Sequence, residues 1–171
     1  MSYASEQDLL LRYLHDLGVM LNFSDDEYLG DTNVLNPRWV TEGVYKLLND
    51  AAIGQHNGVV EMSDLARVLD PRRYPPGKRM YIIEMMRKFE LCFPLDAGSD
   101  RRFLIADLLP KARPNFEFDE ADSLGFEYHY PTVLPGSIIT RFIVAAHAQA
   151  VSGQYWRNGV VLISRPVCGS G

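Results

Sequence analysis

The chain has 171 residues, of which 47% are hydrophobic and 23% charged, and its formal net charge is −5. This balance excludes wholesale disorder and allows one mid-sized domain, or a compact domain with a smaller partner unit. No apolar run reaches the length of about 20 residues that spans a bilayer. The polar, acidic start lacks the regions of a signal peptide, so we expect a cytoplasmic protein.

The first predicted helix covers residues 5–17. Ser5 is a good N-cap, and Gly18 ends the helical pattern. Between them, apolar residues recur at the spacing i, i+3, i+4 and i+7, at Leu10, Tyr13, Leu14 and Leu17. Short extended segments are predicted at 19–23 and 32–35, on either side of an acidic loop.

A second helix is predicted to begin at Asn36 and Pro37, with Asn at the cap and Pro at the first helical position. Its apolar stripe is wide and comprises Trp39, Val40, Val44, Leu47 and Leu48. A polar loop at 50–58 and a brief strand at 59–60 then lead to a short helix, for which Ser63 is the predicted cap.

Two prolines and a glycine predict a turn at 72–77, and a fourth helix is expected over 78–89. The core face of that helix is predicted to be Ile82, Met85, Met86 and Phe89. Apolar runs at 91–95 and 102–105, joined by a polar loop, predict a β-hairpin.

The remaining sequence changes character after a linker at 111–114. Segments 115–119 and 124–130 are strand candidates rich in Phe and Tyr. A helix is predicted to open at 135–137, and a β-branched run predicts a strand at 159–163. The core face of this helix is expected to comprise Ile139, Phe142, Ile143 and Ala146.

This element order predicts an α+β protein of two units. Helices, short antiparallel strands and a final hairpin are typical of a winged helix, so we predict a winged-helix-like N-terminal unit over 1–110. Residues 111–171 are expected to form a small β-rich unit with one helix, packed beside the first unit. Trp39 and Phe89 should both be buried, and truncating either to Ala should cost about 3–5 kcal/mol. One continuous sheet through both halves would contradict this division.

Basic residues concentrate in the segment Arg67–Lys88. It holds seven of the 17 basic residues and two of the 22 acidic ones, so acidic residues outnumber basic ones twofold elsewhere. A winged-helix nucleic-acid-binding domain that uses this segment is therefore the alternative function. It would use Lys78, Arg79, Arg87 and Lys88, on or near the fourth helix. The basic-patch candidates of the chain are Arg72, Arg73, Lys78 and Arg79. Such domains extend their positive field further than one helix, so a nucleic-acid partner is not the expectation.

No catalytic constellation is apparent. The four histidines lie far from one another and from cysteines, which predicts no zinc site; they are His15, His56, His129 and His147. The sequence has no Gly-x-Ser-x-Gly elbow and no glycine-rich phosphate loop. Cys92 lies in an apolar run and is expected to be a buried free thiol. We therefore predict a non-enzymatic interaction protein without catalytic, cofactor-binding or metal-binding residues.

Several segments resemble the COR domain, which follows the Roc GTPase in Roco-family proteins. Residues 11–23 (Leu-Arg-Tyr-Leu-His-Asp-Leu-Gly-Val-Met-Leu-Asn-Phe) are similar to its Leu-His-x-x-Gly-Val-x-Leu-x-Phe opening. Residues 34–40 (Val-Leu-Asn-Pro-Arg-Trp-Val) resemble its Val-x-Pro-x-Trp-Leu element. Residues 86–95 are similar to the Lys-Phe end of its last long helix and the apolar strand that follows. Three later segments resemble the start of the second half of the COR domain, namely residues 130–136, 141–143 and 156–162.

The resemblance implies a coupling role. In the family the first COR unit packs on the Roc GTPase, the second commonly mediates dimerisation, and the GTPase holds GTP or GDP. It also implies that the GTPase domain lies outside this chain and that the second half is truncated after about Ile163. The GTPase-facing piece would be the extended segment before the second helix, Asp31, Thr32, Asn33 and Val34. Asn33 suggests a polar contact, and the turn at 72–79 is the next candidate.

Overall fold

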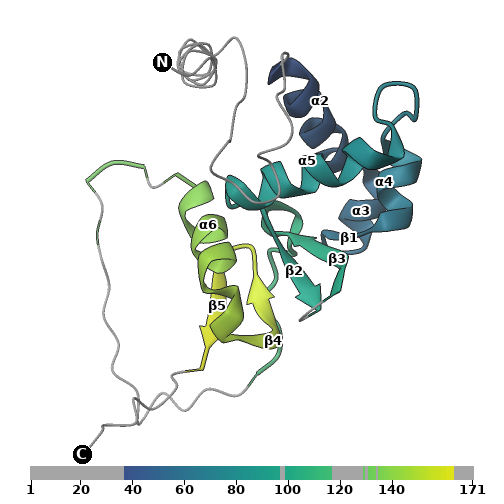
Figure 1. Cartoon of the computed structure of the whole chain (residues 1–171). Helices are drawn as coiled ribbons and strands as arrows, with labels where there is room; N and C mark the ends of the chain where they lie inside the picture. Colours follow the sequence, from purple (N-terminus) through teal and green to yellow (C-terminus); the bar gives the residue numbers. More distant parts are fainter. Residues whose placement is uncertain (1–36, 97–98, 117–128, 130, 134, 164–171) are drawn as a thin grey trace, which may run out of the picture.

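Helices and small antiparallel sheets make up the computed structural model (Figure 1), and the predicted α+β class is confirmed. The segments predicted at 5–17, 19–23 and 32–35 lie outside the part of the chain that the structure describes. No helix of the described part has the length and apolar character that crossing a membrane requires. The described residues are 37–96, 99–116, 129, 131–133 and 135–163.

Helix α2 (Pro37–Leu48) begins at Pro37, as the Asn-Pro pair predicts, and buries Val40, Gly43 and Leu47. Trp39 is partly buried at the edge of the core rather than fully buried. Its Nε1 donates a hydrogen bond to the carbonyl oxygen of Arg73 at 2.8 Å, and its ring stacks on Tyr74 with 4.9 Å between centroids. A tryptophan with a polar N–H commonly sits at such an edge, because the N–H needs an acceptor.

The predicted polar loop at 50–58 contains a short helix, α3 (Ala51–Gln55), that the sequence patterns missed. The carboxylate of Asp50 caps this helix by accepting a hydrogen bond from the backbone N–H of Ile53 at 3.0 Å. Ile53 is its only buried residue. One buried side chain in five residues produces no helical period, so the hydrophobic pattern could not reveal the helix.

The predicted short helix after residue 60 is present as α4 (Met62–Val68), but the predicted cap is wrong. Glu61 is the N-cap and forms a capping box with Asp64, whereas Ser63 already lies inside the helix. The chain enters the helix directly from a strand, so the first turn starts earlier than the serine suggested.

Helix α5 (Pro76–Lys88) starts two residues before its predicted beginning, because proline is well suited to the first helical turn. It buries Tyr81, Ile82, Ile83, Met85 and Met86. The predicted burial of Phe89 is wrong, since this side chain is 52% exposed. Phe89 is the C-cap, and Glu90 follows with a φ of 57°, so the chain leaves the helix before Phe89 can join its buried face.

Three strands form an antiparallel sheet in the order β1-β3-β2, namely β1 (Val59–Glu61), β2 (Cys92–Asp96) and β3 (Ser99–Ile105). The predicted hairpin is confirmed. Gly58 precedes β1 with a φ of 84°, and a Cβ there would lie 2.6 Å from the carbonyl oxygen of Ile105. Only glycine tolerates both this backbone conformation and this close approach.

The three-stranded sheet is apolar on both faces. One face contributes to the first core with side chains from α2 to α5; its strand residues are Val60, Cys92, Phe103 and Ile105. The other face contributes Val59, Phe93, Leu95 and Leu104 to a second apolar cluster. An antiparallel sheet with two apolar faces must be covered on both sides, and the second cover comes from the C-terminal half of the chain.

That cover is helix α6 (Ser137–Ala146), followed by the hairpin of β4 (Ala150–Trp156) and β5 (Gly159–Leu162) (Figure 1). The predicted helix and last strand are present, whereas β4 was missed because polar residues and a glycine interrupt its centre. The buried residues of α6 are Thr140, Ile143 and Val144. Phe142 was predicted on the core face and is 52% exposed.

Within the described residues no strand pairing joins the three-stranded sheet to the two-stranded one. The strands predicted at 115–119 and 124–130 fall almost wholly outside those residues. Residues 115, 116 and 129 are described and are not in strands. The winged-helix arrangement and the domain boundary between 110 and 111 stay predictions.

Candidate coupling and interaction surfaces

Several basic side chains of the segment Arg67–Lys88 form ion pairs with acidic residues of the same chain. Arg67 pairs with both carboxylate oxygens of Asp50 at 2.8 Å and contacts Asp64 at 2.9 Å. The hydrogen bond from Arg67 holds the pKa of Asp50 at about 2, below its ordinary 3.8. Two more pairs follow the same pattern, Arg73 with Glu42 and Arg87 with Glu84.

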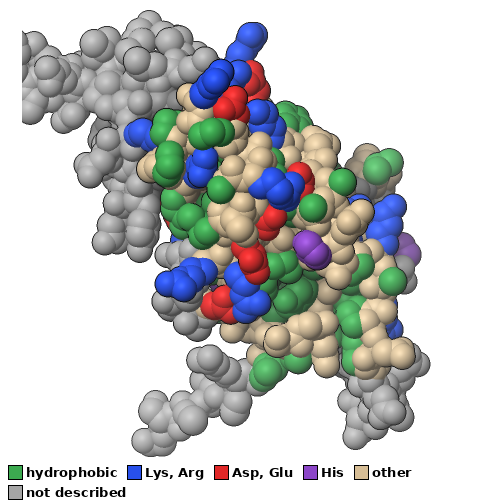
Figure 2. Space-filling view, turned by 90° about the vertical axis from the view of Figure 1, so that its right-hand side faces the viewer, with side chains coloured by type: hydrophobic (Ala, Val, Ile, Leu, Met, Phe, Trp, Pro, Cys, Tyr) green, Lys and Arg blue, Asp and Glu red, His purple; other side chains and the backbone are tan. Residues whose placement is uncertain are grey.

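The four basic-patch candidates lie in the turn before α5 and in its first turn, whereas Arg87 and Lys88 lie in its last turn. Arg72, Arg73 and Lys78 are exposed, while the Nε of Arg79 donates a hydrogen bond to the carbonyl oxygen of Tyr74 at 3.1 Å. On the face shown in Figure 2, Lys and Arg side chains alternate with Asp and Glu. Such mixed charge differs from the continuous positive surface that attracts a phosphate backbone.

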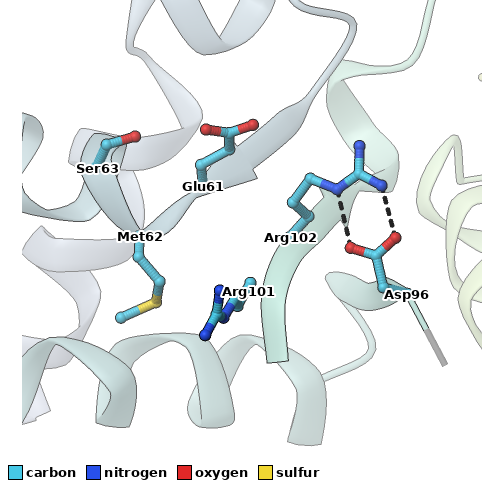
Figure 3. Close-up of a pocket in the computed structure, with 6 residues that line it drawn as sticks. All are labelled: Glu61, Met62, Ser63, Asp96, Arg101 and Arg102. Atoms are coloured by element: carbon cyan, nitrogen blue, oxygen red, sulfur yellow. Dashed lines mark hydrogen bonds and ion pairs between the residues drawn. The ribbon is translucent and has the colours of Figure 1, made fainter. Parts of the chain in front are cut away.

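A hollow of about 570 Å³ lies between the start of α4 and the β2–β3 hairpin (Figure 3). Arg102 donates to both oxygens of Asp96, at 2.8 and 2.5 Å, and thereby lowers the pKa of that carboxyl. Glu61, Met62 and Arg101 line the rest of the hollow with Ser63. Among the described residues that line the hollow there is no histidine, and the carboxylate of Asp96 is paired with Arg102.

An aromatic cluster centred on Phe93 joins the two halves of the chain. The Phe93 ring stacks on His147 with 4.8 Å between centroids and meets Tyr155 edge-on at 6.0 Å. Around it, Leu104 of β3 and Ile143 of α6 are almost completely buried in the same cluster. Burial also raises the pKa of Tyr155. The two halves therefore share one apolar core at this point.

Polar contacts surround this shared core. The Nε of Arg141 on α6 donates to a carboxylate oxygen of Glu90 at 2.9 Å, after the end of α5. In the β4–β5 turn, the backbone N–H of Arg157 donates to the carbonyl oxygen of Pro110 at 2.9 Å. The guanidinium of Arg157 also donates to the carbonyl oxygen of Asp107. These bonds fix the orientation of the second half against the first.

At the junction between the halves, the guanidinium of Arg113 stacks on aromatic rings. The guanidinium of Arg113 lies 4.3 Å from the ring centroid of Phe116 and 6.0 Å from that of Trp156. Contacts of this kind contribute about 0.5–1 kcal/mol at exposed sites. The segment that the sequence predicts as a linker is thus held against β4.

The outward side of α6 is apolar as well. Ile138 is 43% exposed and Phe142 is 52% exposed, one helical turn apart, and Ala145 follows on the same side. A helix that is apolar on its outer side as well as its buried side is suited to contact with another surface.

The predicted GTPase-facing residues, Asp31, Thr32, Asn33 and Val34, lie outside the described residues, so their role stays a prediction. Cys92 is a buried free thiol, as predicted, and burial raises its pKa to about 12. Groups of three or more potential metal ligands do not occur among the described residues.

The sequence predicted that the second unit packs beside the first but did not identify the residues of this interface, although a signal for them was present. In the hairpin, Cys92 and Ile105 face one side while Phe93 and Leu104 face the other. A strand pair with apolar residues at successive positions is covered on both sides. That pattern predicts a second layer of structure but not which segment supplies it.

Two family models match the chain. The COR-A domain, described as C-terminal of Roc, matches residues 1–109, and the COR-B domain, with the same description, matches residues 121–167.

Curated relatives cover most of the chain at low identity. A Roc-COR-CHAT protease from an unknown prokaryotic organism is 23% identical over 155 residues, which are 88% of this chain and 14% of that protein. The Roc-COR-CHAT protease of Runella zeae is 24% identical over 153 residues, 89% of this chain and 16% of that protein. The probable serine/threonine-protein kinase pats1 of Dictyostelium discoideum is 24% identical over 163 residues, 88% of this chain and 5% of that protein. The chain thus spans a small fraction of each relative.

A solved structure gives a similar fold. The structure of Methanosarcina barkeri Roco2 RocCORdC bound to GDP is 40% identical in sequence, with a TM-score of 0.56. The likeness covers 64% of this chain and 34% of that chain.

Proposed function

This chain belongs to the COR family, the domain that lies C-terminal of Roc in Roco proteins, and we propose that it is a non-catalytic coupling module that packs on a Roc GTPase domain. It transmits the nucleotide state of that GTPase to the rest of the protein. The observation that carries the proposal is the match of both halves to successive COR units, at 1–109 and 121–167. The protease and kinase relatives are much longer proteins, and we assign neither activity to this chain.

Guanine nucleotide, in this proposal, is bound by the Roc domain and not by the COR chain. The sequence supports this assignment because it contains no Gly-x-x-x-x-Gly-Lys-Ser/Thr loop to hold phosphates. The similar solved structure, of Roco2 RocCORdC, is bound to GDP, and this supports a Roc domain as the partner and a guanine nucleotide as the ligand of that domain. The partner is a Roc domain in the same polypeptide.

The shared core around Phe93 supplies a physical route for coupling. A displacement imposed on the first unit reaches α6 through Leu104 and Ile143, because both side chains are buried in the same apolar cluster. The ion pair between Glu90 and Arg141 ties the end of α5 to the same helix. Packed elements move together or repack between discrete states, because close-packed cores do not deform continuously.

Dimerisation is the second part of the proposed role, through the second COR unit. The exposed apolar side chains Ile138 and Phe142 on α6 support this placement, because burial of such a surface favours association.

The decisive test is a calorimetric titration of the purified cognate Roc domain with this chain, in the GDP state and in a GTP-analogue state. Coupling requires affinities that differ between the two states, and about fivefold or more is the usual scale. Equal affinities, or no binding in either state, would contradict the proposal. A salt-dependent gel shift on random duplex DNA tests the nucleic-acid alternative, for which stoichiometric binding would be the supporting result.

The proposed GTPase contact can be tested at Asn33. Asn33→Arg should leave the stability of the chain within about 0.5 kcal/mol, as for surface changes in general. It should weaken Roc binding about tenfold, equivalent to about 1.4 kcal/mol. Gln55→Arg, on an exposed position of α3, adds the same charge elsewhere and is the matched control. If both variants bind Roc like the parent, the contact is misplaced and the turn at 72–79 becomes the next surface to test.

A further inference from the structure

An apolar groove runs along α2 and over the end of α5. It encloses about 360 Å³, and side chains of α2 and α5 contribute to the same core beneath it. The α2 side of the groove is Pro37, Thr41, Val44, Tyr45 and Leu48, and Phe89 lies across from them. Tyr45 is 60% exposed and Phe89 is 52% exposed, so the groove presents large apolar side chains that the described residues leave uncovered.

The spacing of these residues matches the surface that a helix packs against. Counting from Pro37, the wall residues lie at i, i+4, i+7, i+8 and i+11. They form a second stripe on α2, next to the buried stripe of Val40 and Leu47. At 1.5 Å per residue the stripe is about 16 Å long, or roughly three helical turns. Ridges and grooves of this length accept another amphipathic helix.

We propose that this groove is the docking site for the amphipathic segment 5–17 of the same chain. The segment carries its apolar residues at i, i+3, i+4 and i+7, from Leu10 to Leu17. A helix with one apolar stripe is stable in water mainly through the packing of that stripe. The groove therefore supplies what the segment lacks, and the segment covers Tyr45 and Phe89.

Chain connectivity favours this occupant. Residues 1–36 run directly into Pro37, which itself lines the groove. Residues 18–36 are long enough for the chain to turn back, since an extended chain spans about 3.3 Å or more per residue. The COR-A family model also begins at residue 1 and ends at 109, so segment and groove belong to one domain.

A second copy of the chain or a foreign helix would have to compete with this tethered segment. Two segments of one chain that are joined by a short linker have an effective concentration of about millimolar for each other, which exceeds the concentration of most partners in solution. The inference does not depend on the proposed role in GTPase coupling, because occupant and groove lie in the same chain.

The test is cysteine cross-linking in the full chain with Cys168→Ser, since buried Cys92 is unreactive. Leu14→Cys with Tyr45→Cys places one thiol on the apolar stripe of the segment and one on the groove. Mild oxidation should yield an intramolecular disulfide, at a rate that is independent of protein concentration. Leu14→Cys with Ser152→Cys, on the exposed middle of β4, is the control and should react at least about tenfold more slowly.

A second pair tests which face of the segment enters the groove. Arg12→Cys with Tyr45→Cys places the thiol on the opposite side of the predicted helix and should react more slowly than the Leu14 pair. Equal rates for the Leu14–Tyr45 and Leu14–Ser152 pairs would overturn the proposal. Disulfides that form only between two molecules, in proportion to concentration, would also overturn it and would identify a second copy as the occupant.

Discussion

The shared core between the two halves can be tested by truncating one side chain, Ile143→Ala. Ile143 is completely buried in the cluster that Phe93 and Leu104 contribute from the other half. The substitution removes three buried carbons, worth about 0.8 kcal/mol each in transfer free energy. A residual cavity adds to that loss, so the free energy of unfolding should fall by about 3–4 kcal/mol. Ile138→Ala on the same helix is the matched control, because Ile138 is 43% exposed, and it should cost less than about 1 kcal/mol.

Two tryptophans make the assay specific to each half. Trp39 lies on α2 and Trp156 on β4, and the sequence contains no others. In the Trp39→Phe background, the fluorescence of Trp156 reports urea unfolding of the second half. In the Trp156→Phe background, the fluorescence of Trp39 reports urea unfolding of the first half. With a shared core, Ile143→Ala should lower both midpoints equally without changing the slope. A lower midpoint at Trp156 with an unchanged one at Trp39 would refute the shared core, because the halves would then unfold independently.

Three further changes probe the local contacts. Trp39→Ala should cost about 3 kcal/mol in urea unfolding, because it removes partly buried packing and the hydrogen bond to Arg73; Trp39→Phe should recover most of the packing part. Gly58→Ala should lower the melting temperature, with a cost of about 1–3 kcal/mol for its positive φ and close carbonyl contact. Gly54→Ala, in open space within α3, should instead be neutral or stabilising. In Asp50→Asn, the free energy of unfolding should fall less than in the parent when the pH is lowered from 7 to 2.

Helical periodicity and turn chemistry predicted much of the first unit. The Asn-Pro start placed α2, and two apolar runs on either side of a polar loop placed the hairpin of β2 and β3. Both signals are local, so a single sequence carries them completely. A local signal can also be wrong. Ser63 is a good capping residue by type, but it lies inside α4, whose N-cap is Glu61.

Contacts distant in sequence were not predictable in the same way. Phe89 has the spacing of a core residue, yet the left-handed conformation at Glu90 turns the chain away. Phe142 and Ile143 are adjacent apolar residues, and only the packing of α6 on the sheet decides which is buried. The ion pairs of Arg67 with Asp50 and of Arg141 with Glu90 join elements 17 and 51 residues apart. Spacing alone cannot specify such partners.

Asp50→Asn provides a test of pH dependence whose sign follows from the pKa. The hydrogen bond from Arg67 lowers the pKa of Asp50 from 3.8 to about 2 in the folded chain. Its contribution to stability is therefore present above pH 3.8 and is lost as pH falls through 3.8 towards 2. The asparagine keeps a side-chain oxygen for the N–H of Ile53 but loses the charge.

Because Arg67 is 47% exposed, solvent screens the pair of Arg67 and Asp50 and its contribution should be about 1 kcal/mol or less. In urea unfolding, Asp50→Asn should be less stable than the parent by that amount at pH 7, and the difference should shrink as pH falls from 3.8 to 2. Adding Arg67→Gln to both proteins is the control, since it removes the main partner of Asp50 and should reduce the pH dependence of the difference; the backbone hydrogen bond from Ile53 remains. A difference that stays constant from pH 7 to pH 2 would mean that this carboxylate does not stabilise the fold through its charge.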